Sequence, residues 1–129
     1  MYVVEHMPRI LVIDDNFELC EMLRVVLMSA GHAVETASGG DEGIRLFQRQ
    51  TPELVLTDIL MPKRSGLETI VTLKSAHPRL KIIAMSGGFL KENLREGDLA
   101  EVMGVDAVLA KPIDPEHLVE LVSEVLARQ

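Results

Sequence analysis

The chain has 129 residues and a mass of 14.3 kDa, with 47% hydrophobic and 26% charged residues, a balance that suits one compact domain and argues against disorder. Its net charge of −7, with no basic patch, disfavours direct binding to nucleic acid. We expect a cytoplasmic protein without membrane attachment, because no apolar run approaches the roughly 20 residues of a membrane span and the first residues carry no secretion signal.

Short apolar runs alternate along the chain with longer stretches of helical periodicity. The first run, residues 10–13, predicts a strand, and apolar residues at helical spacing over 19–30 predict the helix that follows it. Residues 33–37 mix polar with apolar side chains and predict a more exposed strand, followed by a helix over about 40–49. These segments predict two strand–helix units.

The same alternation continues through the middle of the chain. Residues 54–56 predict a strand that ends at Asp58, and a loop then leads to a helix near 66–76. A fourth apolar run, 82–85, predicts a strand that ends at Ser86.

The last predicted unit runs from a fifth strand over 107–110, through Lys111, into the final helix. We expect Asp114 to be the N-cap of that helix and Pro115 its first residue. Five apolar strands linked by helices predict an α/β fold, a doubly wound parallel sheet with helices on both faces. Ligands bind such sheets at the carboxyl ends of the strands.

Polar side chains stand at those carboxyl ends: Asp14, Asp15, Asp58, Ser86 and Lys111. Carboxylates gathered at one edge repel unless they are protonated or neutralised by a cation. Oxygen ligands without a nearby histidine or cysteine favour a hard divalent ion, and so few ligands favour magnesium over calcium. The main alternative is helix capping, which explains one of the two adjacent acids but hardly both.

Each of these residues taken alone is ordinary for a turn, but their order along the chain is specific. The Asp14-Asp15 pair, the segment Asp58-Ile59-Leu60-Met61-Pro62 with Gly66, then Ser86, then Lys111-Pro112, resemble the receiver domain of two-component response regulators. The resemblance covers about residues 9–127. It implies a flavodoxin-like three-layer sandwich with strand order 2-1-3-4-5, a receiver domain over 9–129, and an N-terminal arm or cloning remnant over 1–8.

The resemblance also implies the chemistry of the site. Asp58 would accept a phosphoryl group from a sensor histidine kinase or a histidine phosphotransfer protein. Asp15 and Asp58 would bind Mg²⁺ with the backbone carbonyl of Leu60, and Asp14 would bind it directly or through water. Lys111 would pair with a phosphoryl oxygen, and Ser86 would hydrogen-bond the phosphoryl group once it forms. The Lys111-Pro112 bond is a candidate cis peptide.

On this interpretation the chain is a phosphorylation-dependent switch in a phosphorelay rather than an enzyme with turnover. At most it would catalyse slow phosphotransfer to itself and slow autodephosphorylation. Its partners would be the kinase and a downstream protein that the sequence does not identify, with a homodimer formed on phosphorylation as a further option.

Two departures from the family pattern stand out. Val108 occupies the position, three residues before Lys111, where the family often carries an aromatic ring that turns inward on activation. The stretch between Ser86 and Lys111 is long, and we expect an extended loop, in which Phe89 is a candidate replacement for that ring, and then a short helix from 98 or 99 to 103.

Two other functions use the same sheet edge. An electron carrier of the flavodoxin type would bind flavin mononucleotide there, but a bound phosphate prefers backbone N–H groups and hydroxyls to the acids Asp14 and Asp15. A phosphatase would use Asp58 as its nucleophile, but Leu60 stands where a second acid would serve. We therefore favour the phosphoacceptor.

Overall fold

The computed structural model describes residues 6–59, 66–87 and 104–128. The elements follow the expected alternation of strands and helices, and in chain order they are β1 (Arg9–Ile13), α1 (Phe17–Ser29), β2 (Ala33–Ala37), α2 (Gly40–Arg49), β3 (Leu54–Asp58), α3 (Gly66–Ala76), β4 (Lys81–Ser86), β5 (Ala107–Ala110) and α5 (Pro115–Ala127). Leu60, Phe89 and the helix expected near 98–103 lie outside the described residues.

All strand pairs are parallel, and the sheet order is β2-β1-β3-β4-β5, as the family resemblance implied. The order reverses direction between β1 and β3, the point at which ligands bind in doubly wound sheets. Every residue of β3, the central strand, is buried, whereas the edge strand β2 is only partly buried. The more exposed strand that the sequence predicted is therefore an edge strand.

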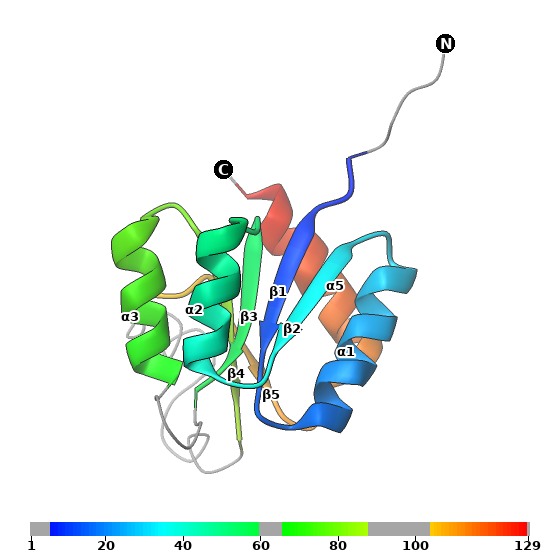
Figure 1. Ribbon diagram of the computed structural model, residues 1–129. Coiled ribbons are helices and arrows are strands. Elements are labelled where there is room, and N and C mark those ends of the chain that lie inside the picture. The colour runs from blue at the N-terminus through cyan, green and yellow to red at the C-terminus, as the bar shows by residue number, and fades with distance from the viewer. Residues whose placement is uncertain (1–5, 60–65, 88–103, 129) are drawn as a thin grey trace.

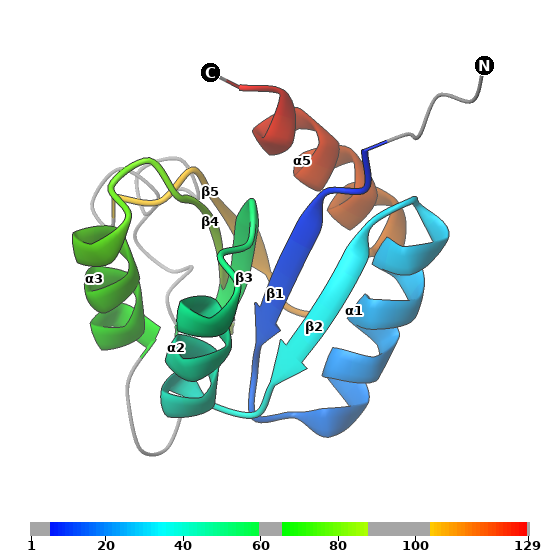
Figure 2. The ribbon, with the colours of Figure 1, turned by 45° about the horizontal axis from the view of Figure 1, so that its top comes forward.

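Helices cover both faces of the sheet, so the molecule has three layers (Figure 1). Helices α2 and α3 lie on one face, and α1 and α5 lie on the other, as the turned view also shows (Figure 2). Each face has its own hydrophobic cluster. Phe47 of α2 and Leu73 of α3 belong to the first, and Leu23 of α1 and Val122 of α5 belong to the second.

The N-termini of α1 and α5 show which side chains cap these helices. Asn16 is the N-cap of α1, and its side chain accepts a hydrogen bond from the Leu19 N–H at 3.1 Å. Asp114 is the N-cap of α5 and Pro115 its first residue, as predicted, but the Asp114 side chain makes no capping hydrogen bond. Because Asn16 caps α1, the capping alternative for Asp14 and Asp15 is not supported.

No helix in the described ranges has the length and apolar character needed to cross a bilayer.

Candidate functional site

The strand register brings the acidic residues to one level at the carboxyl edge of the sheet. Ile13 of β1 pairs with Thr57 of β3, so the next residues, Asp14 and Asp58, lie beside each other. Asp14, Asp15 and Asp58 each offer a carboxylate oxygen, and these atoms all lie within 4.8 Å of one another. The predicted acidic cluster is thus present in the fold.

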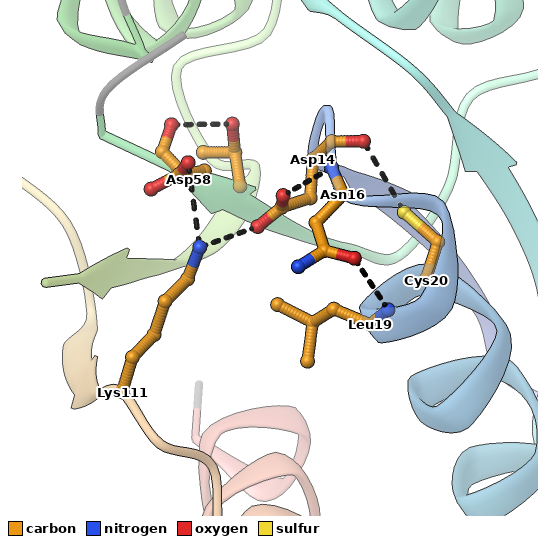
Figure 3. Close-up of polar contacts among 7 residues, drawn as sticks. Asp14, Asn16, Leu19, Cys20, Asp58 and Lys111 are labelled. Carbon is orange, nitrogen blue, oxygen red and sulfur yellow. Dashed lines mark hydrogen bonds and ion pairs between the residues drawn. The ribbon is translucent and has the colours of Figure 1, made fainter.

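Asp14 is held on both of its carboxylate oxygens (Figure 3). Oδ2 contacts the Lys111 ammonium at 2.8 Å, and Oδ1 accepts a hydrogen bond from the Asn16 N–H at 2.8 Å. The side chain of Asp14 is fully buried, and charge-assisted hydrogen bonds of this kind offset the cost of removing a carboxylate from water. Asp14 is therefore fixed in place before any ligand arrives.

Lys111 lies between Asp14 and Asp58 and contacts both. Its Nζ is 2.8 Å from Asp14 Oδ2 and 3.4 Å from Asp58 Oδ2. Its backbone N–H donates to the carbonyl of Ser86 at 2.8 Å, and the Lys111–Pro112 peptide bond is cis, as expected. Burial disfavours the ammonium, but the hydrogen bond and charge of Asp14, with the charge of Asp58, outweigh it and raise the pKa of Lys111 above its usual value. Lys111 stays charged at neutral pH.

The backbone around Asp58 is fixed from three directions. The Thr57 hydroxyl donates to the Asp58 carbonyl at 3.2 Å, and the Ile59 N–H donates to Met85 of β4 at 3.1 Å. The Gly66 N–H, at the start of α3, donates to the Ile59 carbonyl at 2.7 Å. The Asp58 side chain is buried, whereas Asp15, whose carboxylate belongs to the same cluster, is exposed.

The chemistry of the cluster fits a hard divalent cation. Two unit charges about 5 Å apart repel by roughly 3 kcal/mol at an effective dielectric constant near 20, and Lys111 supplies one positive charge against three carboxylates. The nearby sulfur is not a competing soft ligand: burial, followed by the charge of Asp14, raises the pKa of Cys20 to about 11, so the thiol stays protonated. Carboxylate oxygens with solvent access are typical ligands of Mg²⁺.

Ser86 is the last residue of β4 and is buried, and the register places it one position beyond the residue that pairs with Asp58. Val108 is buried on β5, so at that position the chain has an aliphatic side chain and no aromatic ring. The metal ligand expected from the Leu60 carbonyl lies outside the described residues. Five of the six expected site residues can therefore be placed at the same edge of the sheet.

Two contributions to the site carry no clear signal in the sequence. Cys20 is buried, as expected of a small core residue, but its Sγ also donates a hydrogen bond to the Asp14 carbonyl at 3.3 Å. Thr57 is fully buried in β3, yet its hydroxyl contacts the backbone of Asp58. Both sit in apolar segments where periodicity indicates packing alone.

Removing the Lys111 charge should destabilise the protein chiefly when Mg²⁺ is absent. In Lys111→Met, the buried Asp14 loses its ionic partner, and we expect a loss of about 2 kcal/mol in the free energy of unfolding at low ionic strength. Saturating Mg²⁺ should recover much of this loss, because a cation bound to the folded state replaces the missing charge. Chemical denaturation with and without Mg²⁺ measures both values.

The matched control is Arg45→Met, which removes one positive charge from an exposed position on α2. It should change stability little, and equally in both conditions. A Lys111→Met loss that Mg²⁺ leaves unchanged would show that the lysine does not balance the acidic cluster.

The chain is a flavodoxin-like α/β domain with an acidic cluster at the carboxyl edge of its sheet. Residues 10–123 match the response regulator receiver domain family, and the chain belongs to that family. Receiver domains are signalling switches that use Mg²⁺ at an acidic cluster, and they interact with histidine kinases and downstream effectors.

Relatives and solved structures agree with this assignment. The chain is 32% identical over 118 residues to an uncharacterized 14.6 kDa protein of Leptolyngbya boryana, covering 89% of this chain and 87% of that protein. It is 27% identical to the transcriptional regulatory protein GlrR of Escherichia coli, over 95% of this chain and 27% of that protein. A receiver domain protein of Clostridium thermocellum superposes with a TM-score of 0.83 at 30% identity, over 93% of this chain and 94% of that one.

The chain spans a quarter to a half of the transcriptional regulators that it matches, with coverage of 27% for GlrR and 50% for RprY of Bacteroides fragilis. The Vibrio cholerae chemotaxis response regulator CheY4 is matched over nearly its whole length, with a TM-score of 0.81, 26% identity, and coverage of 93% of this chain and 99% of that one. The match thus covers nearly all of some similar chains and only part of others.

Proposed function

We propose that this domain accepts a phosphoryl group on Asp58 and passes the signal on by changing the surface that it offers to a partner. The observation that carries the proposal is the position of the Asp58 carboxylate, which shares a 4.8 Å cluster with Asp14 and Asp15 and lies 3.4 Å from the Lys111 ammonium. That arrangement combines a nucleophile with acids suited to a cation and with a fixed positive charge.

Asp58 needs no general base, because a carboxylate is already ionised at neutral pH. In the transfer step, an Asp58 carboxylate oxygen forms the new O–P bond as the P–N bond to a donor phosphohistidine breaks. The electron pair of that bond stays with the imidazole nitrogen, which is protonated from solvent. With a small acyl phosphate, the P–O bond breaks instead and the carboxylate of the acyl group leaves.

Asp14, Asp15 and Asp58, with the Leu60 carbonyl, would hold Mg²⁺ beside the incoming phosphoryl group. When bound, the ion neutralises negative charge that develops on the phosphoryl oxygens. Asp14 is already oriented by Lys111 and the Asn16 N–H. This orientation supports a role for Asp14 in binding Mg²⁺, either directly or through water. Asp15 is the exposed member of the cluster.

Lys111 and Ser86 would recognise the product. The ammonium of Lys111 already lies 3.4 Å from Asp58 Oδ2 and would pair with an oxygen of the phosphoryl group formed there. The Ser86 hydroxyl would donate a hydrogen bond to the phosphoryl group and draw the end of β4 toward it. A charge-assisted hydrogen bond contributes about 1.5–3 kcal/mol, which is enough to move a two-state population tenfold or more.

The donor would be a histidine kinase or a histidine phosphotransfer protein, and the receiver domain would comprise residues 9–129. Residues 1–8 would be an arm; of its described part, Met7 is 55% exposed and the Pro8 carbonyl accepts a hydrogen bond from the Ala33 N–H. We propose that phosphotransfer and dephosphorylation by the domain alone are slow, since the side chain at Leu60 can neither activate water nor protonate a leaving group.

The test uses acetyl phosphate as the donor and the intact chain. With Mg²⁺ present, mass spectrometry should show the gain of one phosphoryl group, located on the peptide that contains Asp58. A chelator should prevent the gain, and hydroxylamine, which cleaves acyl phosphates, should reverse it. Labelling on another peptide, or labelling that persists with the chelator, would contradict the proposal.

A further inference from the structure

Asp15 differs from the other two acids in how it is held. Its carboxylate is exposed and makes no hydrogen bond or ion pair within the described part of the chain, whereas Asp14 contacts Lys111 and the Asn16 N–H. The position of the Asp15 carboxylate therefore depends on the backbone that carries it and on its own rotamer. A contact that fixes the peptide group between Asp14 and Asp15 restricts the positions that this carboxylate can reach.

That peptide group is held by the thiol of Cys20. Cys20 Sγ donates to the Asp14 carbonyl oxygen at 3.3 Å, which is the oxygen of the peptide bond joining Asp14 to Asp15 (Figure 3). On the other side of the same residue, the Asp14 N–H donates to Ala37 of β2 at 3.0 Å. The Asp14 backbone is thus attached to β2 through its N–H and to α1 through its carbonyl.

The thiol is itself a rigid attachment point. Cys20 is 4% exposed and belongs to the hydrophobic cluster that contains Leu23 and Leu27 of α1. Its own N–H donates to the Asn16 carbonyl at 3.0 Å, which ties it to the first turn of the helix. Because packing and helix geometry fix this donor, its hydrogen bond holds the Asp14–Asp15 peptide at a set position relative to α1.

We infer that Cys20 is a positioning residue for Mg²⁺ binding, acting through Asp15. By holding the Asp14 carbonyl, the thiol keeps the Asp15 carboxylate turned toward Asp14 and Asp58, so that less ordering is needed when the cation binds. This inference rests on the proposed function, because it takes the three acids to be the Mg²⁺ site.

The test is a double-mutant cycle on the affinity for Mg²⁺, measured by isothermal titration calorimetry of the intact chain. Groups that orient metal ligands typically change affinity 10- to 100-fold, and a thiol is a weaker donor, so we expect Cys20→Ala to weaken Mg²⁺ binding roughly three- to tenfold. Asp15→Asn should also weaken binding. In the Asp15→Asn background, Cys20→Ala should have a smaller effect, because the neutral amide oxygen is a weaker Mg²⁺ ligand than the carboxylate and its position matters less.

The matched control is Leu27→Val, which loosens the same hydrophobic cluster on the same helix, away from the acids. Thermal unfolding in chelator records the stability of every variant. Leu27→Val should lower stability without changing Mg²⁺ affinity, while Cys20→Ala changes both.

Three results would overturn the inference: unchanged affinity in Cys20→Ala, an equal loss of affinity in Leu27→Val, or an undiminished effect of Cys20→Ala in the Asp15→Asn background. Failure of the proposed function gives a different result. If Asp15→Asn leaves Mg²⁺ affinity unchanged, the acidic cluster is not the metal site, and the assignment of Asp15 as a ligand is wrong.

Discussion

Asp58→Asn should abolish phosphoryl labelling while making the metal-free protein more stable at low ionic strength. Labelling is lost because an amide is not a nucleophile at neutral pH. Stability rises because the substitution removes the repulsion of Asp58 by Asp14 and Asp15, which outweighs the lost attraction to Lys111 at 3.4 Å. We expect a gain of about 1 kcal/mol, which raises the melting temperature by roughly 3 °C in a domain of this size.

The same substitution should reduce the stabilisation that Mg²⁺ provides, since the proposed metal site loses one carboxylate. Labelling by acetyl phosphate and thermal unfolding with and without Mg²⁺ measure the three effects. Asp114→Asn is the control: it removes the same charge from an N-cap whose side chain makes no capping bond, and asparagine is an equally good N-cap. Labelling of Asp58→Asn at the wild-type rate would place the nucleophile elsewhere, and a metal-free protein less stable than Asp114→Asn would contradict the repulsion.

Gly66→Ala should be strongly destabilising because the start of α3 lies against the backbone that carries Asp58. A Cβ at Gly66 would lie 2.0 Å from the Asp58 carbonyl oxygen and 2.5 Å from Ile59 Cα, where ordinary contacts are 3.4–4 Å. These atoms belong to the backbone and cannot turn aside. Relieving the overlap requires α3 to move away, which breaks the Gly66 N–H bond to the Ile59 carbonyl. We expect a loss of about 3 kcal/mol and slower labelling of Asp58.

Two other glycines in the chain serve as graded controls. A Cβ at Gly39 would meet no atom within 4 Å, so Gly39→Ala should cost less than about 1 kcal/mol. A Cβ at Gly43 would lie 2.4 Å from Ile13 Cδ1, the far end of a side chain, so Gly43→Ala should fall between the other two. Urea denaturation of the three variants tests this order. If Gly66→Ala is as stable as Gly39→Ala, the contact between α3 and the Asp58 backbone does not constrain the fold.

The strand–helix pattern was predictable because burial imposes it on each segment separately. A strand buried on both faces, such as β3, begins with a continuous apolar run, Leu54–Leu56, and a helix such as α5 must bury one stripe. Periodicity therefore identifies each without knowledge of its neighbours. The edge of the sheet that gathers Asp14, Asp58 and Lys111 was predictable for a related reason. Parallel strands end on the same side, so residues that follow them must converge.

Contacts within that edge could not be predicted, because they depend on how elements pack. The sequence indicated a lysine near the acids, but not that Lys111 lies closer to Asp14 than to Asp58, at 2.8 Å against 3.4 Å. Likewise, the apolar pattern of α1 indicated a packing role for Cys20 and gave no sign of its hydrogen bond to Asp14. Distances of this kind follow from register and from the seating of each helix on the sheet.

The order of strands and helices, the acids at the strand ends and the family were thus determined by the sequence itself, since each depends on local patterning or on a motif of fixed spacing. Tertiary structure alone decided which atoms meet. It pairs Lys111 with Asp14 across 97 residues, brings Gly66 close to the Asp58 backbone, and places the Cys20 thiol within hydrogen-bond distance of the Asp14 carbonyl. The physical reason is that burial acts on every segment through its own composition, whereas a hydrogen bond forms only after separate elements have been brought within about 3 Å of each other.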